Sequence, residues 1–182
     1  NVASVWIQSV GVLAVAAWVS MQVPTAVGVG VWAVAFVLMG RAFALFSILA
    51  HEAAHRLLFP KKRWNDLVGK WLLAYPAFVP FDAYRRSHFA HHKDELGPNE
   101  PDLNLYRGYP ITKASWHRKL RRDALGSSGW KNLKGLLGAL RSPTSRPVAL
   151  RIVATQVVLA VALGLTFGRW WLWPVLWLAP WM

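Results

Sequence analysis

The chain has 182 residues, of which 55% are hydrophobic and 12 are tryptophan, and its formal net charge at pH 7 is +13. Soluble basic domains rarely combine so much apolar composition with so much charge, so the composition predicts a membrane protein. The sequence has no cysteine, which excludes disulfides, cysteine zinc sites and cysteine-held iron–sulfur clusters. A bound metal would therefore need nitrogen or oxygen ligands.

Four apolar runs predict a helical protein that crosses a membrane several times. The first two spans are expected at residues 2–23 and 26–50, joined by a short uncharged turn, and a third at residues 148–167. A fourth run, residues 170–182, is shorter than the ~20 residues that a bilayer requires. We therefore expect an all-α, multi-pass transmembrane fold in which residues 1–182 form one truncated domain of a longer protein.

The basic residues orient these spans. All but Arg41 and Arg169 of the 21 Lys and Arg residues lie between Arg56 and Arg151, so the positive-inside rule predicts a cytosolic or interfacial region at residues 51–147.

Two segments of this region carry further signals. The apolar stretch 67–81 is too short to cross twice and predicts an interfacial or re-entrant piece. Residues 130–140 carry apolar side chains at helical spacing and predict a helix that lies among lipid headgroups or packs against the cap. Residues 141–147 are expected to form the loop that follows this helix.

Five of the six histidines fall into two clusters, while His117 is isolated and is expected at the surface. The first cluster, HEAAH at residues 51–55, matches the zinc-peptidase pattern H-E-x-x-H, in which Glu52 would activate water. The alternative interpretation is a pair of histidine ligands one helical turn apart, with the other ligands of the metal supplied by residues elsewhere in the protein. The second cluster, RRSHFAHH at residues 85–92, contains H-x-x-H-H, which puts three imidazoles on one helix face.

Together these clusters resemble the histidine boxes of the membrane fatty acid desaturase and hydroxylase superfamily. HEAAH resembles the first box and RRSHFAHH the second, and the sequence Glu100-Pro101-Asp102-Leu103 is similar to the acidic tail that often follows the second box. The resemblance extends in order over nearly the whole chain. It implies two iron ions, held mainly by histidines, that activate dioxygen to attack an unactivated C–H bond of a lipid chain.

The resemblance also implies roles for individual residues. The expected metal ligands are His51, His55, His88, His91 and His92. A neutral imidazole ligand needs a partner for its other ring nitrogen, and the candidate acceptors are Glu52, Asp94, Glu95, Glu100 and Asp102. No catalytic residue is expected beyond the metal centre, and a third histidine box is expected after the fourth span, outside this sequence.

Arg41 lies within the second expected span, on the same helix face as Glu52. Intramembrane arginines usually face the protein interior and mark functional sites, so Arg41 is a candidate functional residue, either near the substrate path or paired with an acid from a span outside this sequence. The alternative is an arginine that extends its side chain to the interface.

The function expected on this resemblance is fatty acyl desaturation, with lipid, alkyl or carotenoid hydroxylation as the close alternative. Outside the superfamily, the alternatives are a membrane zinc peptidase using HEAAH and a non-catalytic metal-binding or transport protein. The expected partners are a lipid acyl substrate, the membrane and an external electron donor. The donor is expected to be a separate protein because the sequence has no flavin or nicotinamide motif. Nucleic acid is not an expected partner, since the sequence has no nucleic-acid motif. The basic region would attract an acidic carrier such as a ferredoxin, although the same charge would also bind anionic headgroups.

Overall fold

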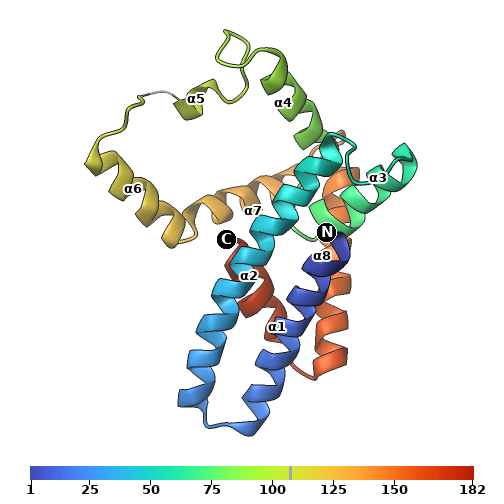
Figure 1. Ribbon diagram of the computed structural model, residues 1–182, viewed down its shortest axis with the longest axis vertical. Helices are drawn as coiled ribbons and strands as arrows, with labels where there is room; N and C mark the ends of the chain where they lie inside the picture. Colours follow the sequence, from blue (N-terminus) through green and yellow to red (C-terminus); the bar gives the residue numbers. More distant parts are fainter. Residues whose placement is uncertain (107) are drawn as a thin grey trace.

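The structure is a computed structural model that describes residues 1–106 and 108–182. These two ranges contain only helices and the segments that connect them, which confirms the all-α prediction. Figure 1 shows three long helices, α1, α2 and α8, that run lengthwise through the molecule. In this view α4 and α5 lie beyond the upper end of α2, and α6 and α7 lie beside and across its upper part.

The three long helices are α1 (Val2–Gln22), α2 (Thr25–Ala54) and α8 (Arg146–Phe167), and each is long and apolar enough to cross a membrane. Large apolar side chains on them are exposed, for example Ile7 at 72% and Leu165 at 73%. An exposed apolar belt is the surface that a spanning helix presents to lipid. The helix α2 continues beyond the expected span 26–50, so the HEAAH motif is helical up to Ala54.

A partly buried segment, residues 62–80, follows α2. It consists of α3 (Lys62–Val68), the π-helical turn η1 (Gly69–Ala74) and a buried loop. Its backbone is satisfied by side chains of two long helices: Trp6 of α1 donates its indole N–H to the Leu72 carbonyl at 2.8 Å, and Gln156 of α8 donates to the Tyr75 carbonyl at 2.8 Å. Buried irregular backbone is stable when protein groups satisfy its hydrogen bonds in this way.

Gly69 allows the segment 62–80 to approach the end of α2 closely. A Cβ atom at position 69 would lie 2.8 Å from the Cβ atom of Ala53 and 2.8 Å from Cζ of Phe81. Both contacts are far shorter than ordinary van der Waals distances. The absence of a side chain at Gly69 therefore lets η1, α2 and the start of α4 meet.

An aromatic cluster holds the C-terminal residues against α1 and α2. It is centred on Trp177 of the π-helical turn η2 (Trp173–Leu178), which is 1% exposed and precedes the short helix α9 (Ala179–Trp181). The Trp177 ring stacks on Trp6 at 5.7 Å between centroids and meets Phe43 edge-on at 5.2 Å. Its indole N–H also donates to the Pro76 carbonyl at 3.2 Å, so this cluster supports the buried loop after η1.

The cap consists of four helices. They are α4 (Phe81–Lys93), α5 (Leu103–Tyr106), α6 (Lys113–Ala124) and α7 (Ser127–Ala139). The helix α4 starts at the buried Phe81 and extends away from the end of α2 (Figure 1). The helix α7 covers most of the expected helix 130–140, and Trp130 is 51% exposed on it.

Candidate metal centre

The first two histidines project from the end of α2. Residues four apart lie one above the other on a helix face, and the His51 and His55 rings are accordingly 4.9 Å apart between centroids. His55 caps the helix, and its backbone N–H still donates to the His51 carbonyl at 3.2 Å. The continuation of α2 to Ala54 therefore fixes the relative positions of both rings.

The helix α4 brings His88 into the space beside these two rings. The Nε2 atom of His88 lies 2.8 Å from Nε2 of His55 and 3.1 Å from Nε2 of His92, and the His88 ring is 4.4 Å from the His51 ring between centroids. Ring nitrogens from α2 and α4 thus converge on one point, with His88 at the centre.

The spacing of these nitrogens suits a metal ion. His51, His55 and His88 each offer a ring nitrogen, and the three atoms lie within 4.8 Å of one another. Two imidazole nitrogens bound ~2.1 Å from one ion are separated by ~3 Å when the angle between them is about 90°. Small side-chain rotations would therefore bring all three rings around one ion.

The same crowding favours the uncharged form of two of these rings, His55 and His88. Burial, together with the neighbouring imidazoles of His51 and His92, lowers the pKa of His88 to about 4. Burial, His51 and His92 also lower the pKa of His55. Neutral imidazole is the form that binds metal ions, so both rings are in the ligand form at neutral pH.

His91, whose ring lies 6.3 Å from the His88 ring between centroids, is paired with a buried carboxylate. The Glu100 carboxylate has no exposed side-chain surface and lies 2.8 Å from Nδ1 of His91. The hydrogen bond to Glu100 raises the pKa of His91. Burial alone would raise the pKa of Glu100, but hydrogen bonds from the Asp102 backbone, His91 and the Leu96 backbone outweigh it and lower that pKa.

The other candidate acceptors are placed differently. Asp102 offers a carboxylate oxygen within 4.8 Å of the His91 and Glu100 ligand atoms, so His91, Glu100 and Asp102 form a second group that could hold a cation. Asp94 accepts the Asn99 backbone N–H at 2.7 Å and so closes the loop after α4. Among the described residues, the Glu52 carboxylate has no hydrogen-bond or ion-pair partner, although the Glu52 backbone carbonyl accepts the Leu57 N–H at 2.9 Å.

Sequence reasoning missed Tyr84, which lies beside His51. Its hydroxyl is 3.3 Å from Nδ1 of His51, and its ring is stacked on His88 at 5.5 Å between centroids. The signal that could have identified it is its position four residues before His88, on the same face of α4. Burial raises the pKa of Tyr84, so it remains a neutral phenol at physiological pH.

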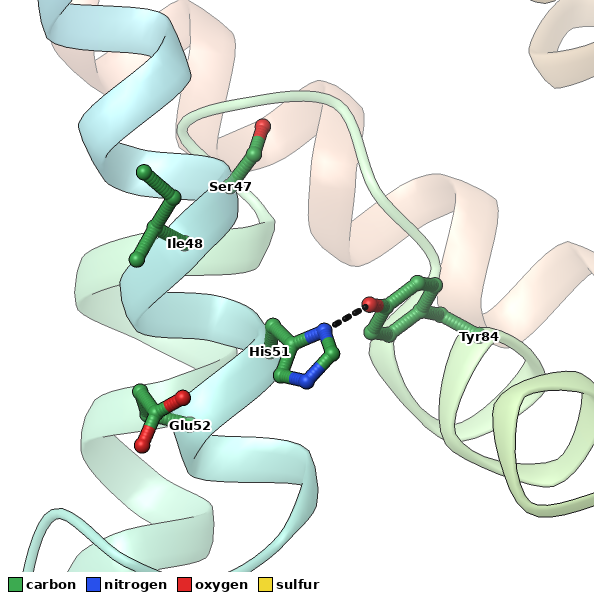
Figure 2. Close-up of a pocket in the computed structure, with 5 residues that line it drawn as sticks. All are labelled: Ser47, Ile48, His51, Glu52 and Tyr84. Atoms are coloured by element: carbon green, nitrogen blue, oxygen red, sulfur yellow. Dashed lines mark hydrogen bonds between the residues drawn. The ribbon is translucent and has the colours of Figure 1, made fainter. Parts of the chain in front are cut away.

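His51 and Tyr84 form one end of an open pocket of about 420 Å³. Ser47 and Ile48, one turn earlier on α2, and Glu52 form the rest of its wall (Figure 2). The Glu52 carboxylate is directed away from the Tyr84 side of the His51 ring (Figure 2). A ligand in this pocket would therefore lie beside the histidine cluster, in contact with both apolar and polar atoms.

Two residues singled out in the sequence lie away from the cluster. Arg41 is exposed on α2 and donates a hydrogen bond to the Gln8 side chain of α1 at 2.9 Å, which gives this charge a polar neighbour on the adjacent helix. His117 is exposed on α6 and takes no part in either group of possible ligands.

Comparison with known proteins gives a consistent family assignment. A family model described as fatty acid desaturase matches residues 28–182. Dihydrorhizobitoxine desaturase of Bradyrhizobium elkanii is 39% identical over 71 residues, which are 39% of this chain and 20% of that protein. The sn-1 oleoyl-lipid 12-desaturase of Anabaena variabilis is 26% identical over 179 residues, covering 86% of this chain and 51% of the relative.

A third relative is the sn-1 acyl-lipid omega-3 desaturase (ferredoxin) of Nostoc sp. (strain 36). It is 32% identical over 82 residues, which are 44% of this chain and 21% of that protein. The chain thus spans about half the length of these relatives or less. No solved structure matches it significantly.

Proposed function

Because the chain belongs to the fatty acid desaturase family, we propose that it acts as a membrane-bound desaturase of acyl lipids. The observation that carries this proposal is the convergence of ring nitrogens from α2 and α4, with Nε2 of His88 2.8 Å from Nε2 of His55 and 3.1 Å from Nε2 of His92. In the reaction, a –CH2–CH2– unit, one dioxygen, two electrons and two protons give –CH=CH– and two waters.

The residues present fit an iron centre. Imidazole is a suitable ligand for iron. The pKa values of His55 and His88 are lowered, so these two rings are neutral at physiological pH and can bind a metal ion. The proposed ligands are His51, His55, His88, His91 and His92. When bound, two iron ions would supply the activation of dioxygen.

The other residues of the site would orient these ligands. Glu100 accepts the Nδ1–H proton of His91, which leaves the lone pair on Nε2 of His91 free for a metal. The Tyr84 oxygen can accept the Nδ1–H proton of His51 in the same way. Both contacts select the tautomer that a ligand needs.

The pocket beside His51 is the proposed approach of the substrate. Ile48 provides an apolar wall for an acyl chain, and Tyr84 lies between this wall and His88. We assign the acyl chain rather than its headgroup to this pocket because its Ile48 wall belongs to a helix that can span the membrane.

Electrons would come from a separate carrier on the cytoplasmic side. The region from Arg56 to Arg151 contains 19 of the 21 basic residues and 7 of the 8 acidic residues, so it would attract an acidic protein. The name of the Nostoc relative includes ferredoxin. We therefore propose an acidic ferredoxin-like donor, and we expect its reduction of the enzyme to slow as salt concentration rises.

The site favours this function over a zinc peptidase. In the peptidase pattern, Glu52 would act on a water bound by His51 and His55. Here the Glu52 carboxylate is directed away from the Tyr84 side of the His51 ring (Figure 2), and His88 occupies the space beside both rings. Hydroxylation, which adds one oxygen atom to the chain, would use the same centre and differs in its product.

Expression of the natural protein with a ferredoxin and its reductase tests the proposal. We expect about two iron ions per protein and a lipid product lighter by two hydrogen atoms, measured by elemental analysis and mass spectrometry. His51→Ala should abolish the product, whereas the control His117→Ala should retain it. One zinc per protein without iron would overturn the proposal, and a product heavier by one oxygen atom would replace desaturation with hydroxylation.

A further inference from the structure

The end of α2 is held by side chains from two other helices. The last carbonyls of a helix have no partner within the helix. At the end of α2, the Ala53 carbonyl accepts hydrogen bonds from Nδ2–H of Asn65 at 2.7 Å and from Nη2–H of Arg85 at 2.8 Å. The Ala54 carbonyl accepts a hydrogen bond from Nε–H of Arg85 at 3.1 Å. Both alanines are 0% exposed, so protein donors rather than bulk water satisfy these carbonyls.

The two donors are themselves fixed. Asn65 of α3 is 0% exposed and accepts the Leu58 backbone N–H at 3.1 Å. The Arg85 side chain is 13% exposed, forms an ion pair with Asp66 at 2.6 Å and lies over the Phe81 ring at 4.7 Å from its centroid. With contacts to two carbonyls, a carboxylate and a ring, the guanidinium has little freedom to move.

This arrangement joins the two histidine clusters. Ala53 and Ala54 lie between His51 and His55 on α2, and Arg85 lies one helical turn before His88 on α4. We propose that Arg85 is a positioning residue that sets the distance between the two histidine clusters, with Asn65 and Asp66 holding the contact in place. The inference rests on the proposed metal centre.

The geometry of the guanidinium explains why an arginine is needed. Its planar fork presents donors in fixed directions, so bonds to two successive carbonyls define both the separation and the rotation of α4 relative to α2. A lysine has one ammonium group on a flexible stem and cannot reproduce this fork. Metal sites tolerate displacements of only about 0.5 Å in their ligands, so losing the fork should weaken binding even when the protein stays folded.

A cobalt titration of the natural protein tests the inference. The protein would be stripped of metal with a chelator and titrated with Co²⁺ at a temperature at which each variant is fully folded. Arg85→Lys should lower Co²⁺ affinity by about 10–100-fold and change the visible absorption of the bound ion, which reports ligand geometry. The matched control is Arg86→Lys, because Arg86 is exposed and has no hydrogen-bond or ion-pair partner within the described residues.

Asp66→Asn is a second variant, which keeps Arg85 but weakens the ion pair that holds its side chain. It tests the inference if Arg85→Lys does not fold. It should change affinity in the same direction. Wild-type Co²⁺ affinity and absorption in these variants would overturn the inference, even if their melting temperatures fell, because Arg85 would then be only a stabilising cap. If the wild-type protein bound no Co²⁺ at its histidines, the proposed metal centre itself would fail.

Discussion

The Nε2 atoms of His55 and His88 lie 2.8 Å apart, although 33 residues separate them in the sequence. His88 also lies 3.1 Å from Nε2 of His92, so it connects the histidines of α2 with the rest of α4. Removing His88 should therefore damage a metal site more than removing His92, which is exposed at the edge of the cluster.

We accordingly expect His88→Ala to abolish tight Co²⁺ binding and His92→Ala to weaken it by about 10–100-fold, the loss typical of a damaged metal site. Titration with Co²⁺ would measure both affinities, with His117→Ala as the control. Equal losses in His88→Ala and His92→Ala would show that His88 is not central to the site.

The buried Glu100 carboxylate should tune His91. Glu100→Gln removes the charged acceptor, so the pKa of His91 in the metal-free protein should fall toward its ordinary value, and metal affinity should drop by about 10–100-fold. Histidine NMR titration would measure the first effect and Co²⁺ binding the second. The neighbouring exposed acid gives the control, since Glu95→Gln should leave Co²⁺ affinity nearly unchanged.

The Asp66–Arg85 ion pair should make stability depend on pH. Burial opposes ionisation of Asp66, but the hydrogen bond and charge of Arg85 outweigh it and lower the pKa of Asp66 below its ordinary value of 3.8. The stabilisation is therefore fully present above pH 3.8 and is lost as pH falls through the lower folded-state pKa.

Asp66→Asn should destabilise the folded protein by about 1–3 kcal/mol at neutral pH. Melting temperatures in detergent should show this difference between wild type and variant, and the difference should shrink below pH 3.8 because the wild type then loses the same charge. A difference that stayed constant to pH 3 would contradict the assigned pKa shift.

Gly69 should tolerate no side chain. Gly69→Ala places a methyl group 2.8 Å from Ala53 and Phe81, and such overpacking costs about 1–3 kcal/mol. In α1, Gly11→Ala meets no atom within 4 Å and should stabilise its helix by up to about 1 kcal/mol. Opposite shifts in melting temperature would support the close packing of η1 on α2, and equal shifts would contradict it.

Much of the fold was predictable because it follows from local pattern. Apolar runs of sufficient length indicated the helices that became α1, α2 and α8, and histidine spacing indicated which side chains share a face of α2 or α4. The end of α2 was less predictable, because the carbonyls of Ala53 and Ala54 are satisfied by residues of α3 and α4 that no local signal connects to them.

The acids illustrate the same limit within the site. Five acidic residues near the histidines were candidate acceptors from the sequence, and of these only Glu52 had a competing role, that of general base in a peptidase. Only the three-dimensional path of the loop after α4 distinguishes Glu100, which is buried against His91, from Asp94, which closes its own loop. Tyr84 was missed because its role depends on α2 and α4 meeting, and residues 33 apart have no spacing rule.

The contact between Arg85 and the end of α2 has a consequence for mutational mapping. On the α2 side, the groups that receive it are main-chain carbonyls of residues that are already alanine. An alanine scan of this helix would pass over positions 53 and 54 without a signal. The side chains that determine the contact belong to Asn65, Asp66 and Arg85. Sequence comparison at positions 53 and 54 can therefore detect only the requirement for a small residue.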